Sequence, residues 1–394
     1  MNILFFTENE VHPNMGGIER VTFILSETFK RLLNHDLYAC YLHPIPGAPN
    51  LYVKKMRWDL SSDTIKQFLL SNQIDIIISQ RQLNHEKLLQ ACIQEVNKNI
   101  ILISVLHCMP GYEITDREYI RYSISYNQGW ASWKYRLKDL FYPIYRNWLQ
   151  YKARKAMQLA YTNSNAFVVL SSTVLDLYVK TYQILPDKKL MAINNPLTYT
   201  YFYPIDKLAT KEKIVLIVSR LEERSKRISN ALKVWKEIEK KHDDWKLLII
   251  GEGPDTNSYK MLVKTWKLKQ VEFLGKCEPF DYYKRSSLFL MTSANEGWSM
   301  TLTEAMQTGN VPIAFDSFPA LHDIIDSGQN GYIVKNGDLK TFISRLCNLI
   351  CDTEKRHRMA EEAIHKVSKF SREKIANNWK DLFNQLEVKN GYKN

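Results

Sequence analysis

Short apolar runs that alternate with amphipathic segments constrain the fold of this chain more than any other feature. In the first half, such runs cover 2–6, 37–42, 74–79, 100–106, 166–170 and 190–193. Their lengths suit buried strands, and the segments between them have the periodicity of helices. This alternation predicts an α/β domain with a doubly wound parallel sheet.

The same alternation starts again after a stretch that contains Pro196 and Pro204. The second series of runs covers 214–219, 245–250, 271–274, 288–291, 311–315 and 331–334, and from 339 onward only amphipathic helix remains. A chain of 394 residues is too long for one ordinary core. We therefore predict two Rossmann-like domains, 1–205 and 206–372, followed by a last helix within 373–394.

The composition bounds the cellular context. The net charge is +12, which favours an acidic partner such as a nucleic acid, a phospholipid surface or a phosphorylated substrate. No apolar run approaches the roughly 18 residues of a membrane-spanning helix, and the run at 3–6 is too short for a signal peptide. We expect a cytoplasmic protein. Its six scattered cysteines form no Cys-x-x-Cys pair, so we expect neither disulfides nor a zinc site.

The stretch 291–311 has the features of a phosphate-binding site. An apolar run leads into a polar loop of Glu296, Gly297 and Trp298, and a helix-forming segment follows Ser299, Met300 and Thr301. The first backbone N–H groups of a helix have no partner inside it and lie at the positive end of its dipole. These N–H groups favour a bound phosphate. Small neighbouring residues let the phosphate come close.

Two carboxylates, Glu296 and Glu304, bracket this anion-binding backbone eight positions apart. Carboxylates beside a phosphate site suggest that hydroxyl groups are bound as well, and a nucleotide sugar carries hydroxyls on both sides of its diphosphate. A structural alternative is a capping box over 301–304, in which Glu304 bonds the Thr301 backbone and Glu296 is a solvated loop residue.

The pair of glutamates with seven intervening residues resembles the signature of glycosyltransferase family 4. These enzymes have the GT-B fold and transfer a sugar from a nucleotide sugar with retention of anomeric configuration. The resemblance implies two Rossmann-like domains that face a cleft, with the helix in 373–394 returning to the first domain. It covers 213–335 closely and the first domain only in places.

Two cations support this resemblance. Arg220 directly follows the predicted strand 214–219, and Lys226 comes six positions later. The family has an arginine and a lysine here, which grip the diphosphate opposite the helix N-terminus. The alternative is a solvated run of charges. Departures from the family are Asp316 and Ser317, where glycines are frequent, and Asp323, where a glutamate is usual; they leave the donor sugar open.

Glycine turns and one histidine complete the predicted site. The resemblance implies that Gly251, Gly275 and Lys276 line the nucleotide pocket, and that Gly16 and Gly17 let the first domain's backbone approach the donor. His107 ends the run 100–106, where the family keeps a histidine near the transferred sugar. A histidine at a strand end is otherwise a structural hydrogen-bonding residue.

The segment 117–155 is basic and aromatic. It has nine Lys or Arg against two acids, with three Trp and eight Tyr or Phe among them. Such a composition suits a lipid headgroup layer, so we hypothesise that the segment docks on the inner face of the cytoplasmic membrane and helps to bind a lipid-linked acceptor. The alternative is that its aromatic residues pack against the sheet and its charges are solvated.

Together these features predict a metal-independent retaining glycosyltransferase that uses a UDP-hexose or UDP-N-acetylhexosamine in bacterial surface polysaccharide synthesis. No Asp-x-Asp triplet suggests a metal, and we expect no cofactor. Glu304 is predicted to hold the ribose, Glu296 the sugar hydroxyls, and Arg220 and Lys226 the departing diphosphate. Two alternatives are a GT-B sugar-nucleotide epimerase and a basic nucleic-acid-binding protein; the second leaves the paired glutamates unexplained, so we expect no nucleic acid.

Overall fold

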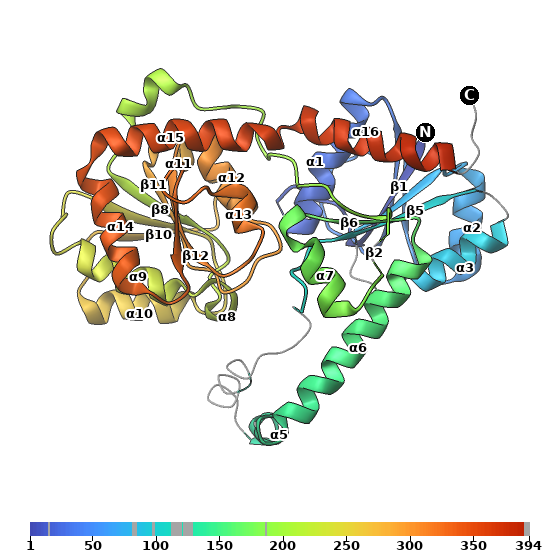
Figure 1. Cartoon of the computed structure of the whole chain (residues 1–394), viewed down its shortest axis with the longest axis horizontal. Helices are drawn as coiled ribbons and strands as arrows, with labels where there is room; N and C mark the ends of the chain where they lie inside the picture. The colour runs from blue at the N-terminus through green and yellow to red at the C-terminus, as the bar shows by residue number, and fades with distance from the viewer. Residues whose placement is uncertain are drawn as a thin grey trace. The chain divides into compact units, whose positions relative to one another are not determined.

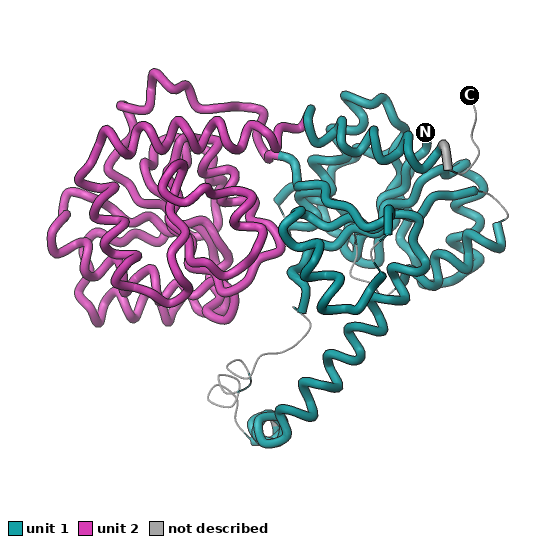
Figure 2. Tube along the Cα trace, in the orientation of Figure 1, with its two compact units in different colours: residues 1–196, 373–394 teal, residues 197–372 magenta. Residues whose placement is uncertain are grey.

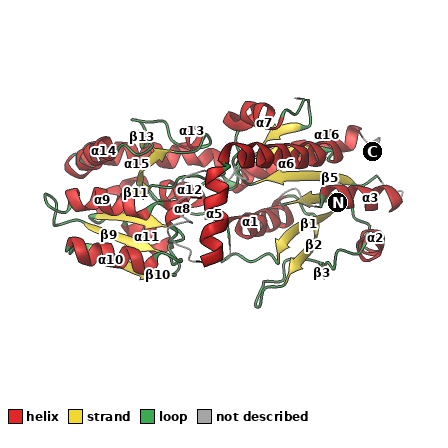
Figure 3. Cartoon of the chain, turned by 90° about the horizontal axis from the view of Figure 1, so that it is seen from below, coloured by secondary structure: helices red, strands yellow, loops and turns green. Residues whose placement is uncertain are grey.

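The computed structural model describes residues 1–14, 16–80, 85–96, 99–111, 120, 129–185 and 187–389. The chain divides into unit 1, Met1–Pro196 with Glu373–Asn394, and unit 2, Leu197–Arg372 (Figure 2). In each unit the strands form one parallel sheet with helices packed on it, as Figures 1 and 3 show. The predicted α/β class and the return of the last helix to the first domain are confirmed.

Unit 1 has a seven-stranded sheet in the order β3-β2-β1-β4-β5-β6-β7. Its strands are β1 (Asn2–Asn9), β2 (Asp36–His43), β3 (Lys54–Arg57), β4 (Ile76–Ser79), β5 (Ile101–Leu106), β6 (Ala166–Val169) and β7 (Leu190–Ala192). Its helices are α1 (Gly17–Leu32), α2 (Ser62–Ser71), α3 (Glu86–Val96), α5 (Gly129–Leu140), α6 (Tyr142–Asn163), the 3-10 turn η1 (Ser172–Val174), α7 (Leu175–Tyr182) and α16 (Arg372–Lys389).

The core of unit 1 occupies both faces of this sheet, because side chains alternate along each strand. Phe5 of β1 packs on Phe29 of α1 with ring centroids 5.8 Å apart. Phe29 in turn meets Trp379 and Phe383 of α16. Phe6 points to the other face, where it packs against a cluster that includes residues of α2 and α3. The C-terminal helix therefore completes the core of the N-terminal unit.

Unit 2 has a six-stranded sheet in the order β10-β9-β8-β11-β12-β13. Its strands are β8 (Ile214–Val218), β9 (Lys246–Ile250), β10 (Val271–Gly275), β11 (Leu288–Met291), β12 (Val311–Asp316) and β13 (Tyr332–Lys335). Its helices are η2 (Ile205–Thr210), α8 (Glu223–Lys226), α9 (Ile228–Ile238), α10 (Thr256–Trp266), α11 (Phe280–Arg285), α12 (Met300–Gln307), α13 (Leu321–Ile324), α14 (Leu339–Cys351), α15 (Thr353–Val367) and η3 (Ser368–Phe370).

Every apolar run that predicts a strand forms one, but β3 has no such run. Its sequence, Lys-Lys-Met-Arg, lies at the edge of the sheet and pairs only with β2. Charged side chains on an edge strand discourage pairing with other chains, and they also remove the apolar signal by which strands are found. The polarity of β3 is therefore a property of its position in the sheet.

The boundary between the units lies at Pro196/Leu197 rather than at the predicted 205/206. The segment that follows Pro196 is hydrogen-bonded to unit 2: Leu197 N–H donates to the Phe370 carbonyl, and Gln307 Nε2 donates to the Tyr199 carbonyl. The prolines interrupt the strand pattern, but these long-range bonds decide to which unit the segment belongs.

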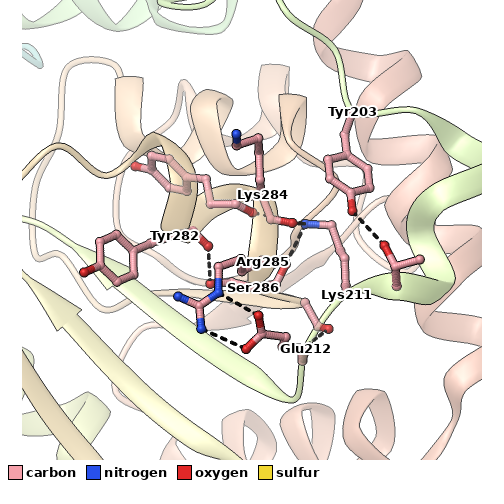
Figure 4. A network of polar contacts seen from close by, with 10 residues as sticks. Tyr203, Lys211, Glu212, Tyr282, Lys284, Arg285 and Ser286 are labelled. Atoms are coloured by element: carbon pink, nitrogen blue, oxygen red, sulfur yellow. Dashed lines mark hydrogen bonds and ion pairs between the residues drawn. The ribbon is translucent and has the colours of Figure 1, made fainter.

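Lys211 fixes the end of the same segment (Figure 4). Its ammonium donates to the carbonyls of Tyr283, Lys284 and Ser286 at 3.1, 3.3 and 2.6 Å, where α11 ends. The last carbonyls of a helix have no partner inside it, and its C-terminus favours a cation. Burial lowers the pKa of Lys211, whereas these carbonyls favour its charged form. The neighbouring Glu212 binds Arg285 through both oxygens at 2.6 and 3.0 Å.

Candidate active site

The carboxyl edge of the unit 2 sheet has a topological switch point between β8 and β11. From β8 the chain adds β9 and then β10 on one side, and β11 starts the series on the other side. Connections that leave neighbouring parallel strands in opposite directions open a crevice at their carboxyl ends, where ligands bind in sheets of this kind. The segments 219–227 and 292–299 follow these two strands.

Lys226 and Glu296 meet across this switch point. Lys226 Nζ lies 2.5 Å from Glu296 Oε1, and Ser293 Oγ donates to the same oxygen at 2.9 Å. The two segments are also joined through Ala294 N–H, which donates to the Ser225 carbonyl at 2.8 Å. The side chains of the ion pair are 21% and 17% exposed. A pair in contact with water contributes about 1 kcal/mol to stability, so a ligand that offers a better partner can open it.

The N-terminus of α12 lies directly after Glu296. Ser299 is its N-cap and accepts from Leu302 N–H at 3.3 Å, so the capping box that would start at Thr301 is wrong. Trp298 is buried with its ring edge-on to Phe370, 4.9 Å away, and its Nε1 has no hydrogen-bond partner among the described residues. Gly297, Met300 and Thr301 complete this turn, where the first helical N–H groups lack partners inside the helix.

Glu304 lies apart from this group. Its side chain is 0% exposed; Oε1 accepts from Thr198 Oγ1 at 2.5 Å and Oε2 from Tyr283 OH at 3.1 Å. The carboxylate is therefore buried and already accepts two hydrogen bonds from protein hydroxyls. The predicted contact with the donor stays a prediction, and the observed role is to join α12 to the segment at Thr198 and to α11.

Arg220 and Lys276 lie at the same carboxyl edge, and both are exposed. Arg220 follows β8, and Lys276 follows the end of β10. The predicted cations thus share one sheet edge. Within the described part of unit 2, Lys226 is the one among them that forms an ion pair with a predicted carboxylate, Glu296.

The glycine turns of unit 2 have a packing reason. Gly251 has a φ of +129°, and a Cβ there would lie 1.9 Å from the Ser219 carbonyl oxygen. Ser219 N–H donates to the Ile250 carbonyl at 3.0 Å, so the two turns after β8 and β9 run side by side. Gly275 has a φ of +70°, which favours glycine. These glycines shape the wall of the site, and contact with a nucleotide stays a prediction for them.

The carboxyl edge of the unit 1 sheet carries His107 after β5. His107 Nε2 is hydrogen-bonded to Oε1 of Gln80, which follows the neighbouring strand β4. Burial lowers the pKa of His107 to about 4, so the ring is neutral at pH 7 and donates through Nε2. Gln80 is fully buried, and its Nε2 has no hydrogen-bond partner among the described residues. His107 therefore has a structural partner, as the alternative interpretation expected, and its contact with a sugar remains a prediction.

Sequence reasoning missed Gln80. A signal was present, because it directly follows a buried strand next to the one that His107 follows. Gly16 is the N-cap of α1, and Gly17 is its first residue, with no atom within 4 Å of a Cβ placed there. Backbone at this edge is therefore open to a ligand at Gly17.

Residues 204–366 match the family model described as "Glycosyl transferases group 1", and this range lies within unit 2. An uncharacterized glycosyltransferase of Haemophilus influenzae is 28% identical over 227 residues, which cover 57% of this chain and 62% of the relative. The amylovoran biosynthesis glycosyltransferase AmsD of Erwinia amylovora is 31% identical over 181 residues, which cover 45% and 50%. The chain thus spans about half to three fifths of the length of these curated relatives.

The fold has solved counterparts over its full length. The pneumococcal O-GlcNAc transferase GtfA, solved with UDP and GlcNAc, has a TM-score of 0.70 and 11% identity, and the match covers 98% of this chain and 99% of GtfA. At this identity the likeness shows the fold alone. The chain has the GT-B fold, and its second unit matches the group 1 glycosyl transferases in sequence.

Proposed function

We propose that this protein is a retaining glycosyltransferase of family 4, which moves a hexose or N-acetylhexosamine from a UDP-sugar to a glycan or lipid-linked acceptor. The observation that carries the proposal is the Lys226–Glu296 ion pair, 2.5 Å long, at the switch point of unit 2 and beside the N-terminus of α12. A cation, a carboxylate and unpaired backbone N–H groups in one place suit a ligand that has both phosphate and hydroxyl groups.

The charges explain how this site favours transfer. When the glycosidic bond to the donor phosphate breaks, negative charge develops on the departing diphosphate. Lys226 and Arg220 supply positive charge at this edge, and the α12 N-terminus supplies N–H donors. Groups that are already oriented stabilise this charge without reorganising, which lowers the barrier to bond breaking.

Binding of the donor exchanges the partners of the ion pair. As Lys226 turns to a phosphate oxygen, Glu296 loses its cation and becomes an acceptor for the hydroxyls of the sugar. For His107 of unit 1 we propose a hydrogen bond to a sugar hydroxyl, and its ring is neutral. We assign no covalent nucleophile; attack from the face that the diphosphate leaves gives the retained configuration.

The relatives support the choice of donor and acceptor. GtfA was solved with UDP and GlcNAc, and AmsD is named for amylovoran biosynthesis. We therefore propose a role for this protein in bacterial surface polysaccharide synthesis. Because the chain covers only part of its curated relatives, the donor and the acceptor belong to the proposal.

The reaction is proposed to need no metal ion. The sequence has no Asp-x-Asp triplet, and Lys226, Arg220 and the helix N-terminus take the charge that a divalent ion would otherwise neutralise. The expected result is an unchanged transfer rate after treatment with EDTA. Loss of activity that magnesium or manganese restores would show that the proposal is wrong on this point.

A panel of nucleotide sugars tests the function directly. A true donor binds only the folded protein and raises its unfolding temperature, and we expect the largest shift with a UDP-hexose or UDP-N-acetylhexosamine. The best donor is then incubated with crude acceptor lipid, and the anomeric configuration of the product is read by NMR. An isomerised nucleotide sugar without a new glycoside would establish the epimerase alternative.

The location of the enzyme is proposed from its acceptor. Within the described residues, no helix has the length and apolarity to span a bilayer. We propose a cytoplasmic enzyme that associates with the inner face of the membrane through the segment 117–155. Of this segment, residues 117–119 and 121–128 lie outside the described residues.

A further inference from the structure

Helices α5 and α6 form an arm on unit 1 that carries exposed apolar side chains. Figures 1 and 2 show α6 leaving the body of unit 1, with α5 at its outer end. The buried residues of α6 are Ala153, Met157, Ala160 and Tyr161, all in its second half. The first half of α6 and α5 therefore lie beyond the packed body of the unit.

Six of the exposed apolar residues of the arm are regularly spaced, and Phe141 and Tyr151 are exposed beside them. The six follow one another at intervals of three or four positions: Trp130, Trp133, Leu137, Leu140, Ile144 and Trp148. Within one helix, residues at these intervals lie on one face, so the first four share a face of α5 and the last two share a face of α6. Trp130 is 75% exposed, and Leu140 and Ile144 are each 70% exposed. We call these six residues the apolar stripe.

Basic side chains accompany the stripe. The described part of the arm, 129–155, contains seven Lys or Arg and one acid, Asp139. Lys152 Nζ lies 3.9 Å from the ring centroid of Trp148, and Lys138 lies 5.1 Å from the rings of Tyr135 and Tyr145. These contacts hold ammonium groups next to the aromatic rings at the solvent-facing surface.

A stripe of this kind suits either a second copy of this chain or a bilayer, and the charge of the arm distinguishes between them. A second copy of this chain would place the same excess of positive charge against this one, and like charges that meet in an interface are unfavourable. An anionic bilayer neutralises the basic residues while its headgroup region takes up the tryptophans. The composition of the arm matches the bilayer and opposes pairing between copies.

We propose that the apolar stripe of α5 and α6 inserts into the headgroup layer of an anionic bilayer, with the surrounding Lys and Arg on the lipid phosphates. This inference rests on the peripheral association proposed above and names the surface responsible for it. Each basic residue near an anionic membrane strengthens binding about fivefold. Deep burial of the stripe is not required, because amphipathic helices lie in the plane of the interface.

The test compares vesicles and variants of the full chain. The wild type is expected to float with vesicles of equal parts phosphatidylcholine and phosphatidylglycerol, and to stay behind with phosphatidylcholine alone or at high salt. The triple variant Trp130→Ser/Trp133→Ser/Trp148→Ser should bind anionic vesicles at least tenfold more weakly. A matched control replaces exposed apolar residues elsewhere, Leu185→Ser and Met261→Ser, which are 85% and 68% exposed and should leave binding unchanged.

Two outcomes would overturn the inference. One is wild-type binding to anionic vesicles by the triple variant; the other is a dimer of the wild type that the triple variant abolishes, which would assign the stripe to a second copy. UDP affinity, measured by calorimetry without vesicles, should be the same in all variants. Failure of UDP binding in the wild type would instead count against the proposed function and leave the membrane result standing.

Discussion

The carboxyl edges of the two sheets differ in their chemistry. At unit 2, Lys226 and Glu296 place a cation and an anion in contact beside the start of α12. At unit 1, a neutral His107 and the amide of Gln80 occupy the corresponding edge. Both edges belong to parallel sheets with the same kind of switch point. Chemistry at such an edge is therefore set by the few residues that follow each strand, and not by the sheet itself.

Each edge, taken by itself, suits a different kind of ligand group. A diphosphate needs opposite charge and N–H donors, which the unit 2 edge supplies. A sugar offers uncharged hydroxyl groups, to which a neutral imidazole and an amide can bind without the desolvation cost of a buried charge. The comparison can be tested by changing one edge at a time.

The largest effect is expected from the cation of unit 2. Lys226→Met should lower kcat/KM for transfer by about 10²–10³-fold, because a group that stabilises developing charge is lost. Steady-state kinetics with the best donor measures this. The control is Lys240→Met, which removes a lysine from an exposed ion pair with Glu237 on the same unit and should leave kcat/KM unchanged. Equal rates for Lys226→Met and the wild type would end the charge argument for unit 2.

Alanine substitutions at Gly251 and Gly17 test the backbone at the two sheet edges. Gly251→Ala should lower the free energy of unfolding of unit 2 by about 2–4 kcal/mol, because the new Cβ meets the Ser219 carbonyl oxygen at 1.9 Å. Gly17→Ala enters open space and should leave unit 1 as stable or slightly more so. Urea unfolding followed by hydrogen exchange separates the two units. If Gly17→Ala lowers transfer without loss of stability, the unit 1 backbone approaches the donor.

The roles of Glu304 and Glu296 can be distinguished by how substitutions at each position change stability and transfer. Tyr283→Phe leaves the buried Glu304 with one hydroxyl fewer and should cost about 2 kcal/mol of unfolding free energy. Glu296→Gln, at the partly exposed ion pair, should cost less than about 1 kcal/mol and reduce transfer instead. Stability and kcat/KM are measured on both variants. If Tyr283→Phe mainly reduced transfer and Glu296→Gln mainly reduced stability, Glu304 would be the glutamate that faces the donor.

The neutral edge of unit 1 should make stability depend on pH. The pKa of His107 is about 4 in the folded chain and near 6.5 when unfolded, so between these values the unfolded state binds the proton. Stability is then lost as pH falls from 6.5 to 4, by at most about 1.4 kcal/mol per pH unit. His107→Gln should reduce this slope. Burial also lowers the pKa of His35 to about 4, so part of the slope should remain until His35→Gln is added.

Much of this architecture could be predicted from sequence, because buried parallel strands are continuous apolar runs. The glutamate spacing and the cations after 219 pointed to two segments that lie at the unit 2 edge, where Lys226 and Glu296 form an ion pair. Donor binding by these residues stays a prediction. The burial of Glu304 could not be foreseen, because its partner Thr198 is remote in sequence and Tyr283 comes from another helix. The same holds for Gly251, whose steric reason is the carbonyl of Ser219 on a different turn.

Helix α16 has a consequence for synthesis of the chain. Phe29, near the start, finds Trp379 and Phe383 only when the last helix exists. During translation, α1 therefore leaves the ribosome with an apolar face uncovered, and it stays so while the whole of unit 2 is made. A nascent chain in this state is a natural client for chaperones. A premature stop codon before 379 would damage unit 1, although most of that unit is made before unit 2.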